Sequence, residues 1–233
     1  MRKGILILIV CITSLFLLGN SQADMGGIPL KSFPNQSELK LNLSLQSKHL
    51  IEELIVVPKE PFDQLEAASM IARIDLLPQS LLAKLNENDI KVELFVGKLT
   101  DNPTADHLKG IIPRGYKSKK KWDHVPGIGG GKTVLVKVGH SEKGQGHGSV
   151  NLELHELAHS VERHVYKELR HNGNFLNVWN AEKYSLFPDR DYFLTFPEEY
   201  FAETFAMFYV GLESRLLLKE KAPLTYEFIN NLK

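Results

Sequence analysis

The chain has 233 residues, with 28 basic and 28 acidic side chains, so its formal net charge is zero. That balance gives no reason to expect nucleic acid or an anionic membrane surface as a partner. Hydrophobic residues make up 43% of the chain, which is enough to form the core of one domain.

The first 23 residues are typical of a secretory signal peptide. Arg2 and Lys3 give a positive start, residues 5–18 are mostly apolar, and Ser21-Gln22-Ala23 supplies the small residues that a signal peptidase needs. We therefore expect cleavage after Ala23 and a secreted, extracellular protein with no membrane attachment. The alternative, an uncleaved membrane anchor, is disfavoured because the apolar run is short for a membrane span.

The single cysteine, Cys11, lies in this leader, so the mature chain has no disulfide and no cysteine ligand. An exported chain of this kind depends on its core or on a bound metal for stability. Residues 24–50 are polar and contain several glycines and prolines, which is typical of an N-terminal extension. Whether that extension is ordered stays open, and residues 51–233 are predicted to form one domain.

Hydrophobic periodicity predicts both strands and helices in the first half of this domain. In chain order, we expect a strand within 50–57, helices at 63–77 and 79–86, and strands at 90–96 and 133–138. The long connection between the last two strands is rich in glycine and proline. A connection of this length in a compact domain is usually functional.

The second half is predicted to be helical. A helix should begin near Val150, with Ser149 as its N-cap and Gly173 as its stop. Two more helices are expected at 197–209 and 224–232. Together these elements predict an α+β fold with a small mixed sheet and a helical C-terminal lobe.

The helix near Val150 carries His155-Glu156-Leu157-Ala158-His159, an H-E-x-x-H sequence. Histidines four residues apart share one helix face, so both imidazoles can reach one metal ion. The adjacent Glu156 can hold and deprotonate a water molecule at that metal. This motif is the zinc signature of many metallopeptidases, and it predicts a zincin-like domain with one Zn²⁺ per chain.

Glu198 and Glu199, at the start of a later helix, are the candidates for a third ligand. Glu199 shares its face with Ala202 and Ala206, and small residues allow a close approach to the histidine helix. Glu198 shares its face with bulky phenylalanines, so Glu199 is the better ligand. Glu203, one turn further on, can accept a hydrogen bond from a ligand histidine.

Two histidines and one glutamate leave the fourth zinc position open, which is the arrangement of catalytic sites. A structural site would be closed by a fourth protein ligand, and His147 is the candidate hardest to dismiss. The alternative to an enzyme is therefore a secreted binding module with a structural zinc and no turnover.

At the two motifs the sequence resembles the catalytic domain of anthrax toxin lethal factor, and more closely the secreted bacterial Pro-Pro endopeptidases. The resemblance extends over most of the chain from about Ile51. Further stretches that carry it are 97–101, 109–115, 122–127 and 144–147. The glycine-rich loop 127–132 is one residue longer than the family pattern, which leaves the preference for residues around the cleaved bond open.

The resemblance implies that His155, His159 and Glu199 bind zinc and that Glu156 is the general base. It also implies that Tyr192, seven residues before the glutamate ligand, stabilises the oxyanion. Three more residues are expected to line or brace the substrate cleft: Lys120, Trp122 and Glu198.

The resulting hypothesis is a monomeric zinc endopeptidase that cleaves between two prolines in a proline-rich peptide or protein. A proline-rich substrate is already extended, which lowers the entropic cost of binding. The resemblance to lethal factor suggests a further alternative, a toxin component that acts inside host cells.

Overall fold

A computed structural model describes residues 25–113 and 119–232, and the expected signal peptide lies outside these ranges. Within them, five strands form one mixed sheet in the order β1-β2-β3-β5-β4. The central strands β2, β3 and β5 are parallel, whereas β1 and β4 pair antiparallel at the two edges. The strands are β1 Ile28–Pro29, β2 Ile55–Val57, β3 Lys91–Phe95, β4 Gly127–Ile128 and β5 Thr133–Lys137.

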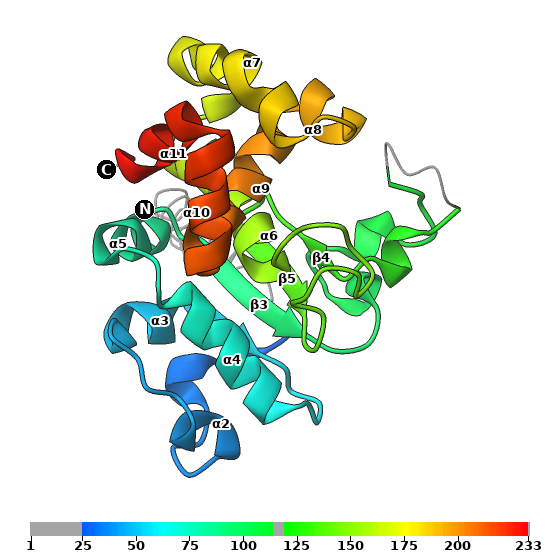
Figure 1. Cartoon of the computed structure of the whole chain (residues 1–233). Coiled ribbons are helices and arrows are strands. Elements are labelled where there is room, and N and C mark those ends of the chain that lie inside the picture. The colour runs from blue at the N-terminus through cyan, green and yellow to red at the C-terminus, as the bar shows by residue number, and fades with distance from the viewer. Residues whose placement is uncertain (1–24, 114–118, 233) are drawn as a thin grey trace, which may run out of the picture.

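Helices surround this sheet, and those of the C-terminal half gather at one end of the molecule (Figure 1). Their bounds are α2 Glu38–Leu41, α3 Lys48–Leu54, α4 Gln64–Ile74, α5 Gln79–Glu87, α6 Leu152–Ser160, α7 Gly173–Leu186, α8 Asp191–Thr195, α9 Pro197–Tyr209, α10 Leu212–Lys221 and α11 Pro223–Asn230. The predicted α+β class, with its small mixed sheet and helical C-terminal lobe, is confirmed.

Helix α6 is the central element, because it packs against β4 and β5 on one side and against α9 on the other. Leu154, Leu157 and Ala158 on this helix are fully buried in the main core. Burying a leucine side chain contributes about 1.5–3 kcal/mol, so this packing fixes α6 firmly between sheet and helical lobe. Any side chain that α6 directs into a cleft is therefore held on a rigid support.

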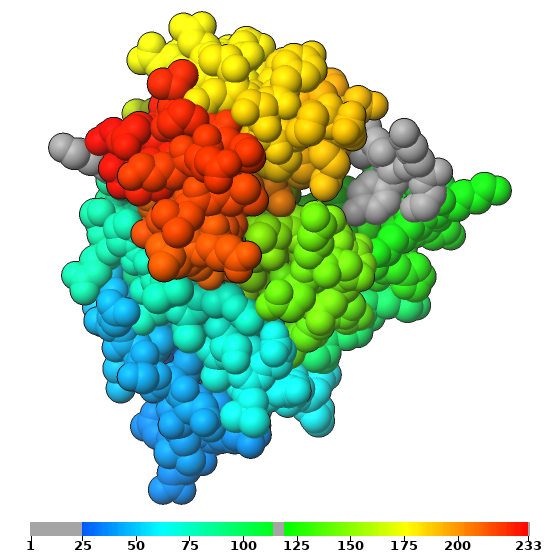
Figure 2. Space-filling model, viewed as in Figure 1, coloured from blue at the N-terminus to red at the C-terminus, as the bar shows by residue number. Residues whose placement is uncertain are grey.

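The segment 25–50 packs onto the rest of the fold. Leu30 and Leu39 are fully buried and belong to the main core. Helix α2 lies at the end of the molecule opposite α7, as the blue and yellow regions of Figure 2 show. These residues, expected as an extension, therefore contribute to the core in the structure.

Two predicted elements are shorter in the structure. The strand expected within 50–57 is present as β2, but it takes only the last three residues of that range, and α3 occupies the first part. Ile51 and Leu54 of α3 are buried with helical spacing, and the Asp75 carboxylate accepts the backbone N–H groups of Gln46 and Ser47 before it. A three-residue strand is too short to produce a visible alternation.

The metal-motif helix is also shorter than predicted. Asn151 is its N-cap, accepting a hydrogen bond from the Leu154 backbone N–H at 3.0 Å, whereas Ser149 binds a histidine. Helix α6 ends at Ser160 and continues as one π-helical segment, Val161–Val165. Gly173 does not stop this helix but begins α7, with Asn172 as its N-cap. No helix among the described residues is long and apolar enough to span a membrane.

Candidate active site

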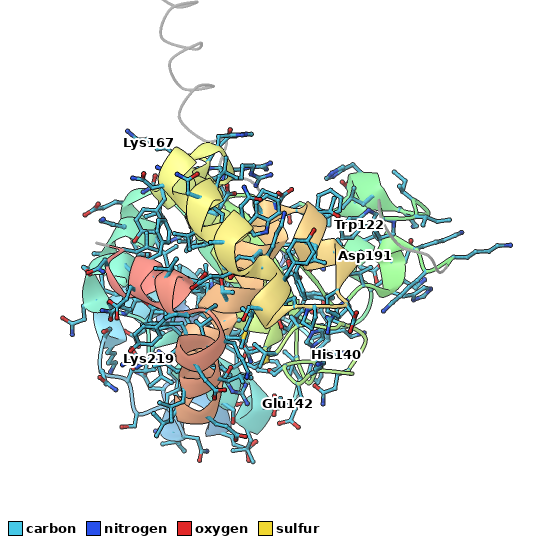
Figure 3. All side chains as sticks on the ribbon, turned by 45° about the horizontal axis from the view of Figure 1, so that its top comes forward. Trp122, His140, Glu142, Lys167, Asp191 and Lys219 are labelled. Atoms are coloured by element: carbon cyan, nitrogen blue, oxygen red, sulfur yellow. The ribbon has the colours of Figure 1, made fainter. Side chains whose placement is uncertain are left out.

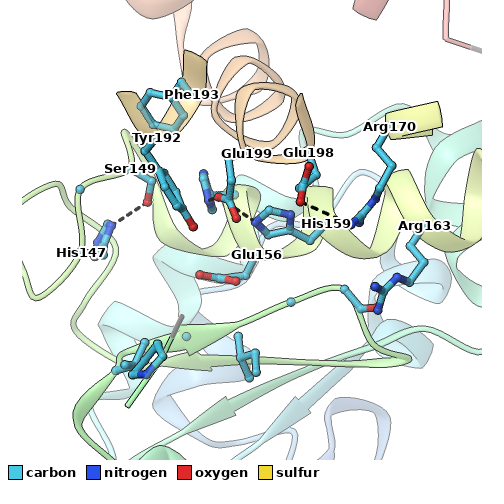
Figure 4. A pocket seen from close by; sticks show the side chains of 18 of the residues that line it. His147, Ser149, Glu156, His159, Arg163, Arg170, Tyr192, Phe193, Glu198 and Glu199 are labelled. Carbon is cyan, nitrogen blue, oxygen red and sulfur yellow. Dashed lines mark hydrogen bonds and ion pairs between the residues drawn. The ribbon is translucent and has the colours of Figure 1, made fainter. Parts of the chain in front are cut away.

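A cleft of about 420 Å³ lies between the edge strand β4 and helices α6, α8 and α9 (Figure 4). The H-E-x-x-H residues form part of its wall, and both apolar and charged side chains complete the lining. The apolar members are Pro113, Trp122, Val125, Ile128 and Phe193, and the charged members besides the motif are Arg163, Arg170, Arg190, Glu198 and Glu199.

Three of the expected ligands converge at this cleft. The Nε2 atoms of His155 and His159 each lie 3.4 Å from Oε2 of Glu199. Zinc–ligand bonds of about 2.0–2.1 Å in a tetrahedral site place neighbouring donor atoms about 3.3 Å apart, so these two distances match those of a tetrahedral metal site. Among the described residues, it is the one group of three or more potential ligands whose donor atoms converge, all within 4.8 Å.

Glu203 supports the ligand set from behind. Its Oε2 lies 3.1 Å from Nδ1 of His155, and its Oε1 accepts the backbone N–H of Val150 at 3.0 Å. This contact places the His155 Nδ1 proton toward Glu203 and leaves Nε2 to face the cleft. Glu203 was expected in this position from its place one helical turn after Glu199.

The charges of the site are tightly coupled. Burial alone would lower the pKa of His155, but the carboxylates of Glu199 and Glu203 outweigh it and raise that pKa to about 10. Burial alone would raise the pKa of Glu199, but the two motif histidines hold it well below its usual range. Without metal, a proton on His155 balances the negative charge of the carboxylates. A metal ion would replace that proton, so proton and metal compete for the site.

His147 is not placed as a fourth ligand. Its Nδ1 lies 2.7 Å from the Ser149 hydroxyl and its Nε2 lies 2.8 Å from the carbonyl oxygen of His140. Both ring nitrogens are therefore engaged within the loop that leads into α6. The donor set keeps the open position of a catalytic metal site, against the alternative of a closed structural one.

Glu156 faces the cleft from α6 toward β4, and two glycines make this approach possible. A Cβ on Gly129 would lie 1.9 Å from the carbonyl oxygen of Glu156, and one on Gly127 would lie 2.9 Å from Cγ of Glu156. Only glycine allows the edge strand to run this close to the helix. Burial in this narrow space raises the pKa of the Glu156 carboxyl, which suits a group that accepts and returns a proton.

Tyr192 points from α8 into the cleft beside Glu199, with its hydroxyl toward the metal ligands (Figure 4). Helix α7 holds α8 in place. Trp179 Nε1 donates to the Phe193 carbonyl at 3.0 Å, and Lys183 Nζ donates to the Leu194 carbonyl at 3.1 Å. These two bonds fix the helix that carries Tyr192.

The three residues expected at the substrate cleft have different positions. Trp122 lines the cleft, on the same side of the molecule as α8 (Figure 3). Glu198 also lines it and lies 3.5 Å from Nη1 of Arg170. Lys120 instead braces the loop before α6, because its Nζ donates to the Gly146 carbonyl at 2.9 Å.

Three arginines of the cleft were missed by sequence reasoning. Arg163 follows His159 by four residues, so its place on the same helix face could have been found from spacing alone. Arg170 and Arg190 come from segments whose structure was not predicted, and no local pattern placed them at the cleft.

Comparison with known proteins agrees with this geometry. Residues 42–232 match the family described as "Anthrax toxin lethal factor, N- and C-terminal domain". The chain belongs to this family. A Pro-Pro endopeptidase of Clostridioides difficile (strain 630) is 34% identical over 226 residues, covering 97% of this chain and 96% of that protein.

A second relative of this lethal factor-like chain, a Pro-Pro endopeptidase of Paenibacillus alvei, is 37% identical over 188 residues, covering 80% of the chain and 86% of that protein. The solved structure of a Pro-Pro endopeptidase from Paenibacillus alvei covers 79% of this chain and 100% of its own, with a TM-score of 0.75 and 37% identity. Together with the ligand geometry, these relatives make the chain a metalloendopeptidase.

Proposed function

We propose that this protein is a secreted zinc endopeptidase that hydrolyses the bond between two prolines in proline-rich proteins. The observation that carries the proposal is the convergence of His155, His159 and Glu199 next to Glu156, in a chain whose relatives are named Pro-Pro endopeptidases. Secretion rests on the leader-like sequence of residues 1–23. We further propose that the protein acts as a monomer.

The two histidines and Glu199 would hold zinc, which, when bound, supplies a Lewis acid that polarises the scissile carbonyl and acidifies water. Glu156 takes the proton of the attacking water and returns it to the leaving nitrogen. The Tyr192 hydroxyl donates a hydrogen bond to the oxygen that becomes negatively charged as the carbonyl is attacked. Glu203 keeps His155 in the tautomer that presents Nε2.

The cleft suits proline on physical grounds. Trp122 offers a flat aromatic face, against which a proline ring can pack. A proline after the cleaved bond has no backbone N–H, so the cleft recognises it by shape and loses no hydrogen bond there. A polyproline segment is already extended, and it can lie along β4, the free edge of the sheet.

The test is a set of matched peptides with Pro-Pro, Ala-Pro or Pro-Ala at the centre, incubated with the zinc-loaded protein. We expect efficient cleavage of the Pro-Pro peptide between its prolines, and none after chelation of the metal. Glu156→Ala should retain zinc and lose turnover by about 10²–10⁴-fold, the contribution typical of a general base. Equal cleavage of all three peptides would refute the proline specificity, and activity in Glu156→Ala would refute the proton-transfer role.

A further inference from the structure

The arginines that line the cleft differ in their partners. Arg170 is engaged by two carboxylates: it forms a 2.5 Å ion pair with the fully buried Glu162, and its Nη1 lies 3.5 Å from Glu198. Arg163 and Arg190 also line the cleft, but no carboxylate among the described residues contacts either of them. The charge of Arg170 is therefore used within the fold, whereas those two guanidinium groups are available to a ligand.

Arg163 is held in a fixed orientation. Its Nη1 donates to the Gly130 carbonyl at 3.0 Å, just after the end of β4 (Figure 4). The same glycine is tied to α6 from its other side, because its N–H donates to the Ser160 hydroxyl at 3.0 Å. The guanidinium thus lies at the end of the edge strand, and among the described residues the Gly130 carbonyl is the one group that accepts a hydrogen bond from it.

The position of Arg163 along the cleft follows from its contact with Gly130. A Cβ on Gly130 would lie 3.7 Å from Cβ of His159 and 3.8 Å from Nη1 of Arg163, so this guanidinium lies next to the second ligand histidine. Four residues rise at most about 6 Å along a helix, and an extended peptide rises about 3.3 Å per residue, so the guanidinium lies about two residues along the peptide from the metal ligands. Arg190 lies at the opposite end, since its Nη2 is 3.7 Å from the position of a Cβ on Gly148, beside His147 and Ser149.

We propose that Arg163 is a specificity residue that binds an acidic side chain of the substrate, two or three residues from the cleaved bond. This inference rests on the proposed function, because it adds a flanking requirement to Pro-Pro cleavage. A guanidinium presents a planar fork of N–H donors that matches the two oxygens of a carboxylate. The preferred substrate is thus a Pro-Pro segment with Asp or Glu on the side of the bond that faces Gly130.

The surroundings of Arg163 support an anionic ligand. Burial lowers the pKa of His164, and the positive charges of Lys132 and Arg163 lower it further, so this region carries net positive charge. The one acidic neighbour along the chain, Glu162, is fully buried and bound by Arg170, so it does not compete for Arg163. An anionic side chain entering here meets positive charge without a carboxylate in contact with the guanidinium.

The experiment uses Pro-Pro peptides in pairs that differ only by Glu or Gln, placed two or three residues from the bond on either side. For each pair, the ratio of kcat/KM for the Glu peptide to that for the Gln peptide is measured with the wild type, Arg163→Gln and Arg190→Gln. Gln at position 163 is two bonds shorter than Arg and gives up the bond to the Gly130 carbonyl, but His164 Nε2, 3.2 Å from that carbonyl, still contacts it. Arg190→Gln is the matched control, since it removes the same charge from the other end of the cleft.

We expect the wild type to favour Glu by about three- to tenfold at one of these positions, the effect of a partly exposed ion pair. Arg163→Gln should bring that ratio to about one, and Arg190→Gln should leave it as in the wild type. The inference is overturned if the wild type cleaves both members of every pair equally. It is also overturned if both variants lower the ratio alike, because the preference would then come from the overall positive charge of the cleft and not from contact with Arg163. Failure to cleave any Pro-Pro peptide would overturn the proposed function itself.

Discussion

The strongest test of the metal site is the substitution Glu203→Gln. The Glu203 carboxylate accepts two hydrogen bonds, from Nδ1 of His155 at 3.1 Å and from the backbone N–H of Val150 at 3.0 Å. A glutamine amide has the same shape but only one acceptor atom, so its NH₂ group must face one of these two donors. An unsatisfied buried donor costs about 1–3 kcal/mol. Zinc affinity should therefore fall by about 10–100-fold, the usual effect of losing such a support.

The assay is equilibrium competition for zinc against a chromophoric chelator at neutral pH, with circular dichroism to show that the variant is folded. Glu213→Gln is the control, because Glu213 is an exposed residue on α10, away from the cleft, and the substitution removes the same charge. Turnover of Glu203→Gln should recover in part when zinc is in excess. If Glu203→Gln bound zinc as tightly as Glu213→Gln, Glu203 would not be orienting His155.

Two further predictions concern packing and pH. Gly129→Ala should destabilise the protein by about 3 kcal/mol or more, because its Cβ would meet the Glu156 carbonyl. Gly173→Ala is the control, since a Cβ there meets nothing within 4 Å, and its melting temperature should stay close to that of the wild type. Equal melting temperatures of the two variants would contradict this prediction. In the metal-free protein, the pKa of His155 is raised from 6.5 to about 10. The stabilisation by its proton is therefore complete below pH 6.5 and lost as the pH rises to about 10. The Tm of the metal-free protein should fall across that window, and a constant Tm would refute the coupling.

Sequence reasoning located the residues that lie on regular helices. The spacing of His155 and His159 placed them on one helix face, and the small residues beside Glu199 predicted that α9 could approach α6 closely. The structure brings these three residues together, and α6 and α9 are in extensive contact. Such predictions succeed because a helix converts sequence separation directly into direction.

The residues that were missed lie where sequence separation carries no such information. Arg170 reaches the cleft through a turn in which Lys167 and Glu168 both adopt positive φ. Lysine and glutamate rarely take that conformation, so the sequence does not predict the turn. Gly173 was interpreted as a helix stop although Asn172 before it is an N-cap signal, so α7 and its contact with α8 were lost from the prediction. Gly127 and Gly129 belong to a glycine-rich loop that is visible in the sequence, but their close approach to Glu156 is a tertiary contact that the sequence does not show.

Helix α6 and its continuation connect the chemistry and the specificity of this cleft. Glu203 fixes His155 near its start, Gly129 sets the distance to Glu156 at its middle, and Ser160 and Arg163 hold the loop after β4 at its end. The metal ligands lie on the α-helical part, whereas Arg163 lies on the π-helical segment. Because these are successive parts of one rigid support, a substitution at Arg163 can change which peptides fit without moving the metal ligands. We therefore expect selectivity to be tuned at the π-helical segment and the loop it holds, while the chemistry stays fixed by α6 and α9.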